Sequence, residues 1–215
     1  MKYLSFLLCL ALFTACSFDN NQLQKAHERF IEKIDNNQYE KAAKRVDKLS
    51  VEYLSQLRDH LQASDARKAY DLGMAFDCPL STLLIYESLQ EAFQTEGATF
   101  SMEDMLMYLS MVEIGILGPH RSARFRFQEV AFSDDQSAAV KVLMSTGNDN
   151  SFIGTKHFYN KEGGRWKISI PSTFLVEEKI FKQLHRRSGM DEMAFMEEHV
   201  KAGRQDIEFR YRIPR

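Results

Sequence analysis

Residues 121–171 contain four stretches with the alternation of β-strands, and they constrain the fold more strongly than any other part of the chain. The strand-like stretches are 124–132, 138–144, 152–159 and 165–170, with polar turns at 133–136, 147–150 and 161–164. A parallel return between two strands needs a dozen or more residues, so connections this short join antiparallel neighbours. The sequence therefore predicts one contiguous antiparallel sheet.

The alternation also indicates how this sheet is covered and bent. Trp166, Ile168 and Ile170 share one face of the last stretch, while Lys167 belongs to the other face. In the first stretch the alternation slips by one residue after Gln128, as it does at a β-bulge, and bulges bend sheets. We therefore expect a strongly curved sheet whose apolar face is covered by helices.

Most of the remaining chain has helical periodicity. Helices are expected at 22–34, from Tyr39 onward, from Ser50 as N-cap, at 65–72 with Gly73 as its end, at 80–93, after a cap formed by Ser101 and Asp104, and at 173–187 and 190–202. The sequence thus predicts an α+β fold, in which a helical N-terminal half packs on a curved four- to five-stranded antiparallel sheet followed by C-terminal helices.

The fifth strand of that prediction is the segment 206–214, which alternates cleanly between apolar and charged residues. A terminal strand at the sheet edge is one interpretation of this pattern. The other is an exposed docking strand or a membrane-surface segment, because Arg204, Arg210, Arg212 and Arg215 make the segment basic. Both interpretations stay open at the level of the sequence.

The first 15 residues have the features of a signal peptide. Lys2 is followed by an apolar run that is too short to span a bilayer comfortably, and small residues close the segment. An ordinary secretory signal cut near Ala15 would have these features. Phe13-Thr14-Ala15-Cys16, however, resembles the lipobox of bacterial lipoproteins, although Phe13 stands where Leu is usual. The resemblance implies that cleavage leaves Cys16 as the first residue, acylated and inserted in the membrane.

This cleavage determines the expected cellular location and the net charge of the mature chain. Ser17 after the lipidated cysteine resembles an outer-membrane sorting signal, which implies a lipoprotein facing the periplasm, with 16–21 as lipidated residue and tether. Removal of Lys2 leaves 27 basic against 30 acidic residues, a formal net charge of −3. A nucleic-acid partner would require a strongly basic face, so we expect none. Cys9 leaves with the signal, so Cys78 is the remaining thiol and is expected to be a half-buried structural residue.

Three segments of the chain resemble the nuclear-transport-factor-2-like, or cystatin-like, α+β roll. They are AlaHisGluArgPheIleGluLysIleAspAsnAsnGlnTyrGluLysAlaAla, AlaPheSerAspAspGlnSerAlaAlaValLysVal and GluGlyGlyArgTrpLysIle. The resemblance implies a single roll-like domain over 22–215, with a helical insert at about 50–118 and a C-terminal extension at 172–215. Either departure could fill the pocket that such rolls leave open.

Enzymes of this family place an acid–base pair in the cone of the roll, and that resemblance directs attention to the strands. His157 and Tyr159 share a strand face and are the candidate catalytic pair, with Arg124 and Arg126 as candidate anion-binding residues. Glu129 lies at the slip of the alternation, so its face is ambiguous. The sequence by itself favours a half-exposed structural role for His157. The other five histidines lack ligand spacing, so no metal and no cofactor are predicted.

Three functions remain compatible with the sequence. The first is a lipid-anchored, non-enzymatic envelope module that binds a protein, lipid or glycan in the concavity of the sheet. The second is a small-molecule lyase or isomerase that uses His157 in the cone. The third is a periplasmic immunity-type protein, which fits the size and address of the chain but rests on no particular residue.

Overall fold

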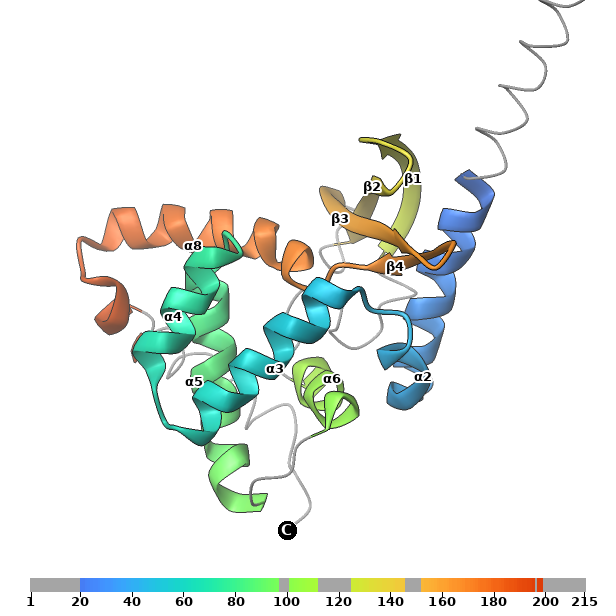
Figure 1. Ribbon diagram of the computed structural model, residues 1–215. Coiled ribbons are helices and arrows are strands. Elements are labelled where there is room, and N and C mark those ends of the chain that lie inside the picture. Colours follow the sequence, from blue (N-terminus) through green and yellow to red (C-terminus); the bar gives the residue numbers. More distant parts are fainter. Residues whose placement is uncertain (1–19, 97–100, 112–124, 146–151, 196, 199–215) are drawn as a thin grey trace, which may run out of the picture.

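The computed structural model describes residues 20–96, 101–111, 125–145, 152–195 and 197–198. The chain has the α+β fold expected, with helices before and after a single antiparallel sheet (Figure 1). The signal peptide, Cys16, Arg124 and the alternating segment 206–214 lie outside the described residues. Among those that are described, no helix combines the length and apolarity needed to cross a membrane.

The sheet has four strands in the order β1-β2-β3-β4, and each neighbouring pair is antiparallel. The strands are β1 (Phe125–Phe132), β2 (Ser137–Ser145), β3 (Phe152–Glu162) and β4 (Arg165–Ile168). The register between β1 and β2 shifts between Phe127 and Glu129, which confirms the predicted bulge. Gly163 and Gly164 form the last turn, both with positive φ, so β3 extends three residues further than the sequence indicated.

The helices begin with one over residues 20–35, coloured blue beside the sheet in Figure 1. Before the sheet come α2 (Tyr39–Ala43), α3 (Lys48–Gln62), α4 (Ala66–Ala75), α5 (Pro79–Glu96) and α6 (Met102–Met111). After it come η2 (Pro171–Phe174), α8 (Leu175–Ser188) and helical residues at 192–195 and 197–198. The caps at Ser101 and Asp104 and the break at Gly189 are confirmed.

The expected start of α3 was wrong by one helical turn. Asp47, not Ser50, is the N-cap, and its side chain accepts a hydrogen bond from the backbone N–H of Ser50 at 2.7 Å. Aspartate is as good a cap as serine, and starting the helix at Lys48 leaves Ser50 free to bond to the sheet. In the first turn of the helix, Leu49 is 51% exposed.

The expected end of α4 at Gly73 was also wrong, because the helix continues to Ala75. A Cβ at Gly73 would lie 2.6 Å from Cα of Pro79 and 2.8 Å from the Thr82 side chain. Glycine therefore stands here because α4 and α5 approach each other closely, and not because the helix stops. A sequence pattern does not distinguish these two reasons for a glycine near a helix end.

The core has two connected parts. The apolar side of the sheet, with Val140, Val142 and Ile168 fully buried, packs under the helix at residues 20–35. The second part lies between the helices, where Leu54, Leu57 and Leu83 are fully buried. Figure 1 shows α3 beginning beside β4 and running away from the sheet, next to α4 and α5, with α8 running across α4 and α5. The helical half thus forms a layer of its own beside the sheet.

Candidate functional site

Three polar side chains meet inside the core, between the first helix and the sheet. Nδ1 of His27, from the helix at residues 20–35, lies 2.7 Å from the hydroxyl of Tyr159 in β3. The ring centroids of His27 and His157 are 5.8 Å apart, and Phe127 lies 6.1 Å from His27. His27, His157 and Tyr159 are each no more than 2% exposed. We call these three residues the histidine–tyrosine cluster.

The register of the sheet explains the position of the two β3 members. His157 is paired with Val140 and Tyr159 with Ala138, and both partners are buried on the inner face of the sheet. Residues two apart in a strand point to the same face, so His157 and Tyr159 must both point inward. The sequence correctly predicted that they share a face. It was wrong in favouring half-exposure for His157, which is 1% exposed.

Burial determines the protonation states in the cluster. Removal from water lowers the pKa of His27 from 6.5 to about 4. The pKa of His157 lies well below its usual range, first because of burial and second because His27 is close. Burial raises the pKa of the Tyr159 hydroxyl well above 10. Both imidazoles are therefore neutral near pH 7, and Tyr159 keeps its proton.

The remaining sequence candidates do not join the cluster in the described part of the chain. Arg126 lies in β1 opposite Leu143, and Arg124 falls outside the described residues. Glu129 pairs across the strands with Lys141 on the outer side of the bulge, at 3.2 Å. Among the described residues, no carboxylate hydrogen-bonds to His27 or Tyr159. The cluster therefore brings two neutral imidazoles next to one protonated phenol, with His27 and Tyr159 hydrogen-bonded to each other.

Sequence reasoning missed His27, although a signal for it exists. His27 lies four residues after Leu23 and three before Phe30, on the face of the first helix that also contains Ile34. A polar residue in the middle of an apolar helical stripe must be buried and must find a hydrogen-bond partner. Its partner is 132 positions away in the chain, so only the folded structure identifies it.

A second buried polar site joins the helices to the edge of the sheet. The carboxylate of Asp47 accepts hydrogen bonds from the Ser50 hydroxyl and, at 2.6 Å, from Nδ2 of Asn160. The Ser50 hydroxyl in turn accepts from the backbone N–H of Ile170 at 2.7 Å. The backbone N–H of Asp47 donates to the carbonyl of Ile168 in β4 at 2.9 Å. We call this network the Asp47 junction; its groups satisfy one another, as a structural site requires.

A third buried polar site lies in the helical layer, at the carboxylate of Glu178 in α8. One of its oxygens accepts a hydrogen bond from the backbone N–H of Ser81 at 2.8 Å, in the first turn of α5. The other lies 3.3 Å from Nζ of Lys182. A negative charge at a helix N-terminus is stabilised by the unpaired N–H groups there, and Lys182 supplies a neighbouring positive charge. Glu178 therefore fixes α8 against α5.

Cys78 is a core residue and not a reactive thiol. Its side chain is fully buried, more deeply than the half-exposure expected from the sequence, and it forms no disulfide. Burial raises the pKa of its thiol to about 12, so the thiolate is scarce at neutral pH. In the part of the chain that is described, no group of three or more His, Cys, Asp or Glu residues could hold a metal ion.

Two open grooves on the described surface lie along α4. One lies between α3 and α4, where Leu49, Leu72 and Phe76 form an apolar floor. The other lies between α4 and residues 191–193, with Met74 and Met193 on its walls. Neither groove includes a member of the histidine–tyrosine cluster. The two grooves and the buried polar cluster thus lie in different places in the described structure.

No protein-family model matches the chain, and no curated protein is significantly similar to it in sequence.

Proposed function

We propose that this chain is a lipid-anchored module of the bacterial cell envelope that binds a partner without transforming it. The observation that supports this proposal is the burial of His157 and Tyr159, the pair that an acid–base enzyme of this shape would use. A general acid or base must come within hydrogen-bond distance of its substrate. His157 and Tyr159 are each 1% exposed and lie next to His27, so we assign them to the packing of the core instead.

The same burial moves the proposed binding surface away from the concave face of the sheet. Ala138, Val140 and Val142 on the inner face are in the core beneath the first helix. A ligand in the concavity would have to displace that packing at the cost of buried apolar area. The proposal therefore assigns binding to the outside of the helical layer. It treats residues 22–215 as one domain, with the predicted insert 50–118 and extension 172–215 forming that layer.

The anchor in this proposal is Cys16, and the chain leaves little distance between it and the fold. The described part of the first helix starts at residue 20. Four extended residues reach about 14 Å at most, so the start of this helix would lie close to the bilayer. Several acyl chains, at about 0.8 kcal/mol for each buried methylene, hold such a module stably in the membrane. We place it at the outer membrane, facing the periplasm.

A labelling experiment tests the anchor. In bacteria that express the chain and are grown with an alkyne analogue of palmitate, we expect label on the wild-type protein and recovery in the membrane fraction. Cys16→Ser should abolish both, because it removes the thiol that carries the lipid. Cys78→Ser is the matched control and should keep both. Label that persists in Cys16→Ser, or a wild-type chain that is processed without label, would contradict the lipoprotein assignment.

Histidine modification tests whether the cluster is sealed from small molecules. We expect diethyl pyrocarbonate at neutral pH to modify His60, which is half-buried in α3, and to leave His27 and His157 unmodified in the folded protein. Mass spectrometry of peptides from the intact folded chain gives the three rates. Modification of His157 at the rate of His60 would show that small molecules reach the cluster. That result would favour the lyase or isomerase over the binding module.

A further inference from the structure

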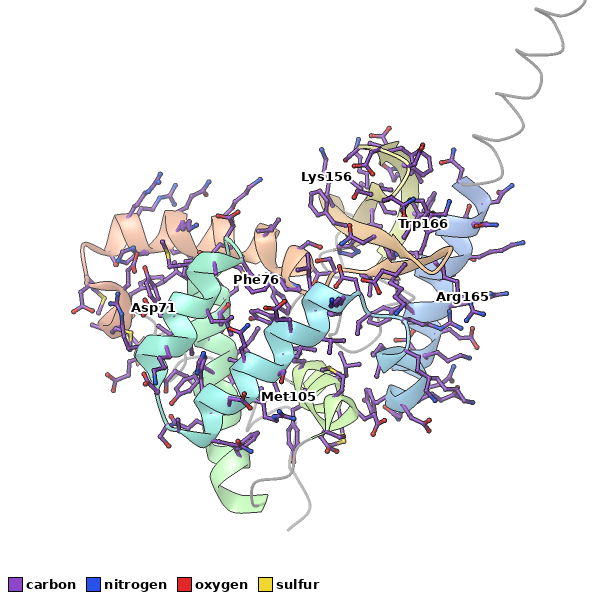
Figure 2. The ribbon with its side chains drawn as sticks, in the orientation of Figure 1. Asp71, Phe76, Met105, Lys156, Arg165 and Trp166 are labelled. Carbon is purple, nitrogen blue, oxygen red and sulfur yellow. The ribbon has the colours of Figure 1, made fainter. Side chains whose placement is uncertain are left out.

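The groove between α4 and residues 191–193 has a defined shape and chemistry. One wall is a single face of α4, formed by Arg67, Tyr70, Asp71 and Met74, which recur at the three- and four-residue spacing of a helix. The opposite wall consists of residues 191–193, and the groove has a volume of about 640 Å³. Figure 2 labels Asp71 on α4, beside the terminal helical segment. We call this feature the α4–tail groove.

The apolar and charged groups of the groove are arranged for an amphipathic ligand. Met74 is 55% exposed and Met193 is 42% exposed, which leaves apolar side chains uncovered on both walls. Arg67 is engaged with Asp71 at 3.2 Å and with the ring of Tyr70.

Acidic groups outnumber basic ones along the groove, since Asp71, Asp191 and Glu192 face a single arginine, Arg67. A complementary ligand would combine apolar contacts with an excess of positive charge.

The chain itself contains a segment with this chemistry. In residues 204–215 the apolar side chains are Ile207, Phe209, Tyr211 and Ile213, and they alternate with Glu208, Arg210 and Arg212. Four arginines stand against two acidic residues in the segment, so it is basic overall. In an extended conformation the apolar residues would lie on one face and the arginines largely on the other.

We propose that residues 204–215 of this chain bind in the α4–tail groove in an extended conformation. The described chain reaches residue 198, six positions beyond Glu192 on the wall of the groove. Residues 199–206 could span at most about 28 Å, which is enough to return along a groove of this length. The segment is linked covalently to its site, so its effective concentration is in the millimolar range and a modest contact area suffices.

The position of the chain exit also distinguishes this site from the sheet edge that the sequence suggested. Among the described residues β1 pairs with β2, at one edge of the sheet. Figure 1 shows β1 and the terminal helical segment at opposite ends of the molecule, with α8 between them. One wall of the α4–tail groove, residues 191–193, lies five to seven positions before the last described residue, 198. For a segment bound within its own chain, the groove is the nearer site.

Amide hydrogen exchange of the full chain in detergent tests this proposal. We expect residues 206–213 to exchange at least about tenfold more slowly than an unstructured peptide of the same sequence. Met74→Lys and Met193→Lys each place a positive charge on an exposed wall position, where it would repel the arginines. Both variants should remove the protection of 206–213. Leu49→Lys is the matched control, because Leu49 is similarly exposed but lies in the other groove.

Each outcome of this experiment decides the proposal. Protection that is lost in Met74→Lys and Met193→Lys but kept in Leu49→Lys supports binding in the α4–tail groove. An unprotected segment in the wild type overturns it, as does protection that survives both groove variants. Protection that disappears on dilution would show that a second copy of the chain supplies the segment, and that result also overturns binding within one chain. The anchor at Cys16 plays no part in these outcomes.

Discussion

Replacing Asp47 by alanine should lower the free energy of unfolding by about 3–5 kcal/mol. The substitution removes the cap of α3, which the Ser50 N–H satisfies, and leaves the Ser50 hydroxyl and the Asn160 amide without this acceptor. A lost cap costs roughly 1 kcal/mol, and the two further donors add about 1–2 kcal/mol each, in the lower part of the usual range because Asn160 is only partly buried. Urea unfolding followed by circular dichroism and by fluorescence of Trp166, the single tryptophan, measures the change.

Asp65→Ala is the matched control for the Asp47 junction. Asp65 is also an aspartate at a helix N-cap and accepts one hydrogen bond from the backbone N–H of Lys68 at 3.0 Å, but it is not buried in a network. Its replacement should cost about 1 kcal/mol. Asp47→Asn keeps the shape and one oxygen acceptor, so its effect should lie between the two. Equal costs for Asp47→Ala and Asp65→Ala would show that the contacts to the sheet contribute nothing beyond the cap.

Acidification from pH 7 to pH 5 should destabilise the protein through the histidine–tyrosine cluster. In the unfolded chain His27 titrates near 6.5, whereas burial lowers its pKa in the folded protein to about 4. The unfolded chain therefore binds protons in this range that the folded chain does not. The contribution of neutral His27 to the free energy of unfolding is complete above the pKa that His27 has in the unfolded chain. It decreases as the pH falls toward the pKa that His27 has in the folded protein. Between pH 7 and pH 5, the titration of His27 alone should lower the free energy of unfolding by about 2 kcal/mol, and His157 acts in the same direction.

The double variant His27→Gln/His157→Gln isolates this effect, because glutamine does not titrate. Urea unfolding at several pH values should show the decrease in the wild type, whereas the variant should be nearly flat between pH 7 and pH 5. His60→Gln, on the exterior of α3, should behave as the wild type. The pKa of Glu162 is lowered mainly by its hydrogen bond from the Lys48 N–H, so its contribution is lost only at more acidic pH. An unchanged pH dependence in the double variant would show that the cluster is not responsible.

Both predictions concern the boundary between helices and sheet. His27 joins the first helix to β3, and Asp47 joins the start of α3 to β3 and β4. The two sites hold the first 50 residues to strands that are more than a hundred positions away in sequence. Loss of either site should therefore loosen the sheet from the helical layer before it disrupts the secondary structure of the strands.

Local patterns predicted much of the fold correctly. The strands followed from alternation and short turns, the bulge from one slip in that alternation, and the caps at Ser101 and Gly189 from residue type. Each of these features is decided by neighbours within a few positions, which a sequence displays directly. Ser50 and Gly73 were misinterpreted because their roles depend on β4 and α5, which approach them only after folding.

The candidate site was predicted in part for the same reason. His157 and Tyr159 were correctly placed on one strand face, since the period of a strand is two residues. Which side of the sheet is covered depends on the helix that contributes His27, and alternation contains no information about that helix. The burial that decides between catalysis and packing therefore could not be obtained from β3 alone.

By itself the sequence determined the order of helices and strands and their antiparallel pairing, and it predicts a signal peptide over residues 1–15. These depend on periodicity, on turn length and on short local motifs. Only the tertiary structure decided that two histidines and a tyrosine meet in the core, and that the two grooves lie along α4. Such features arise from contacts between segments far apart in the chain, and a linear pattern does not specify which distant segments pack together.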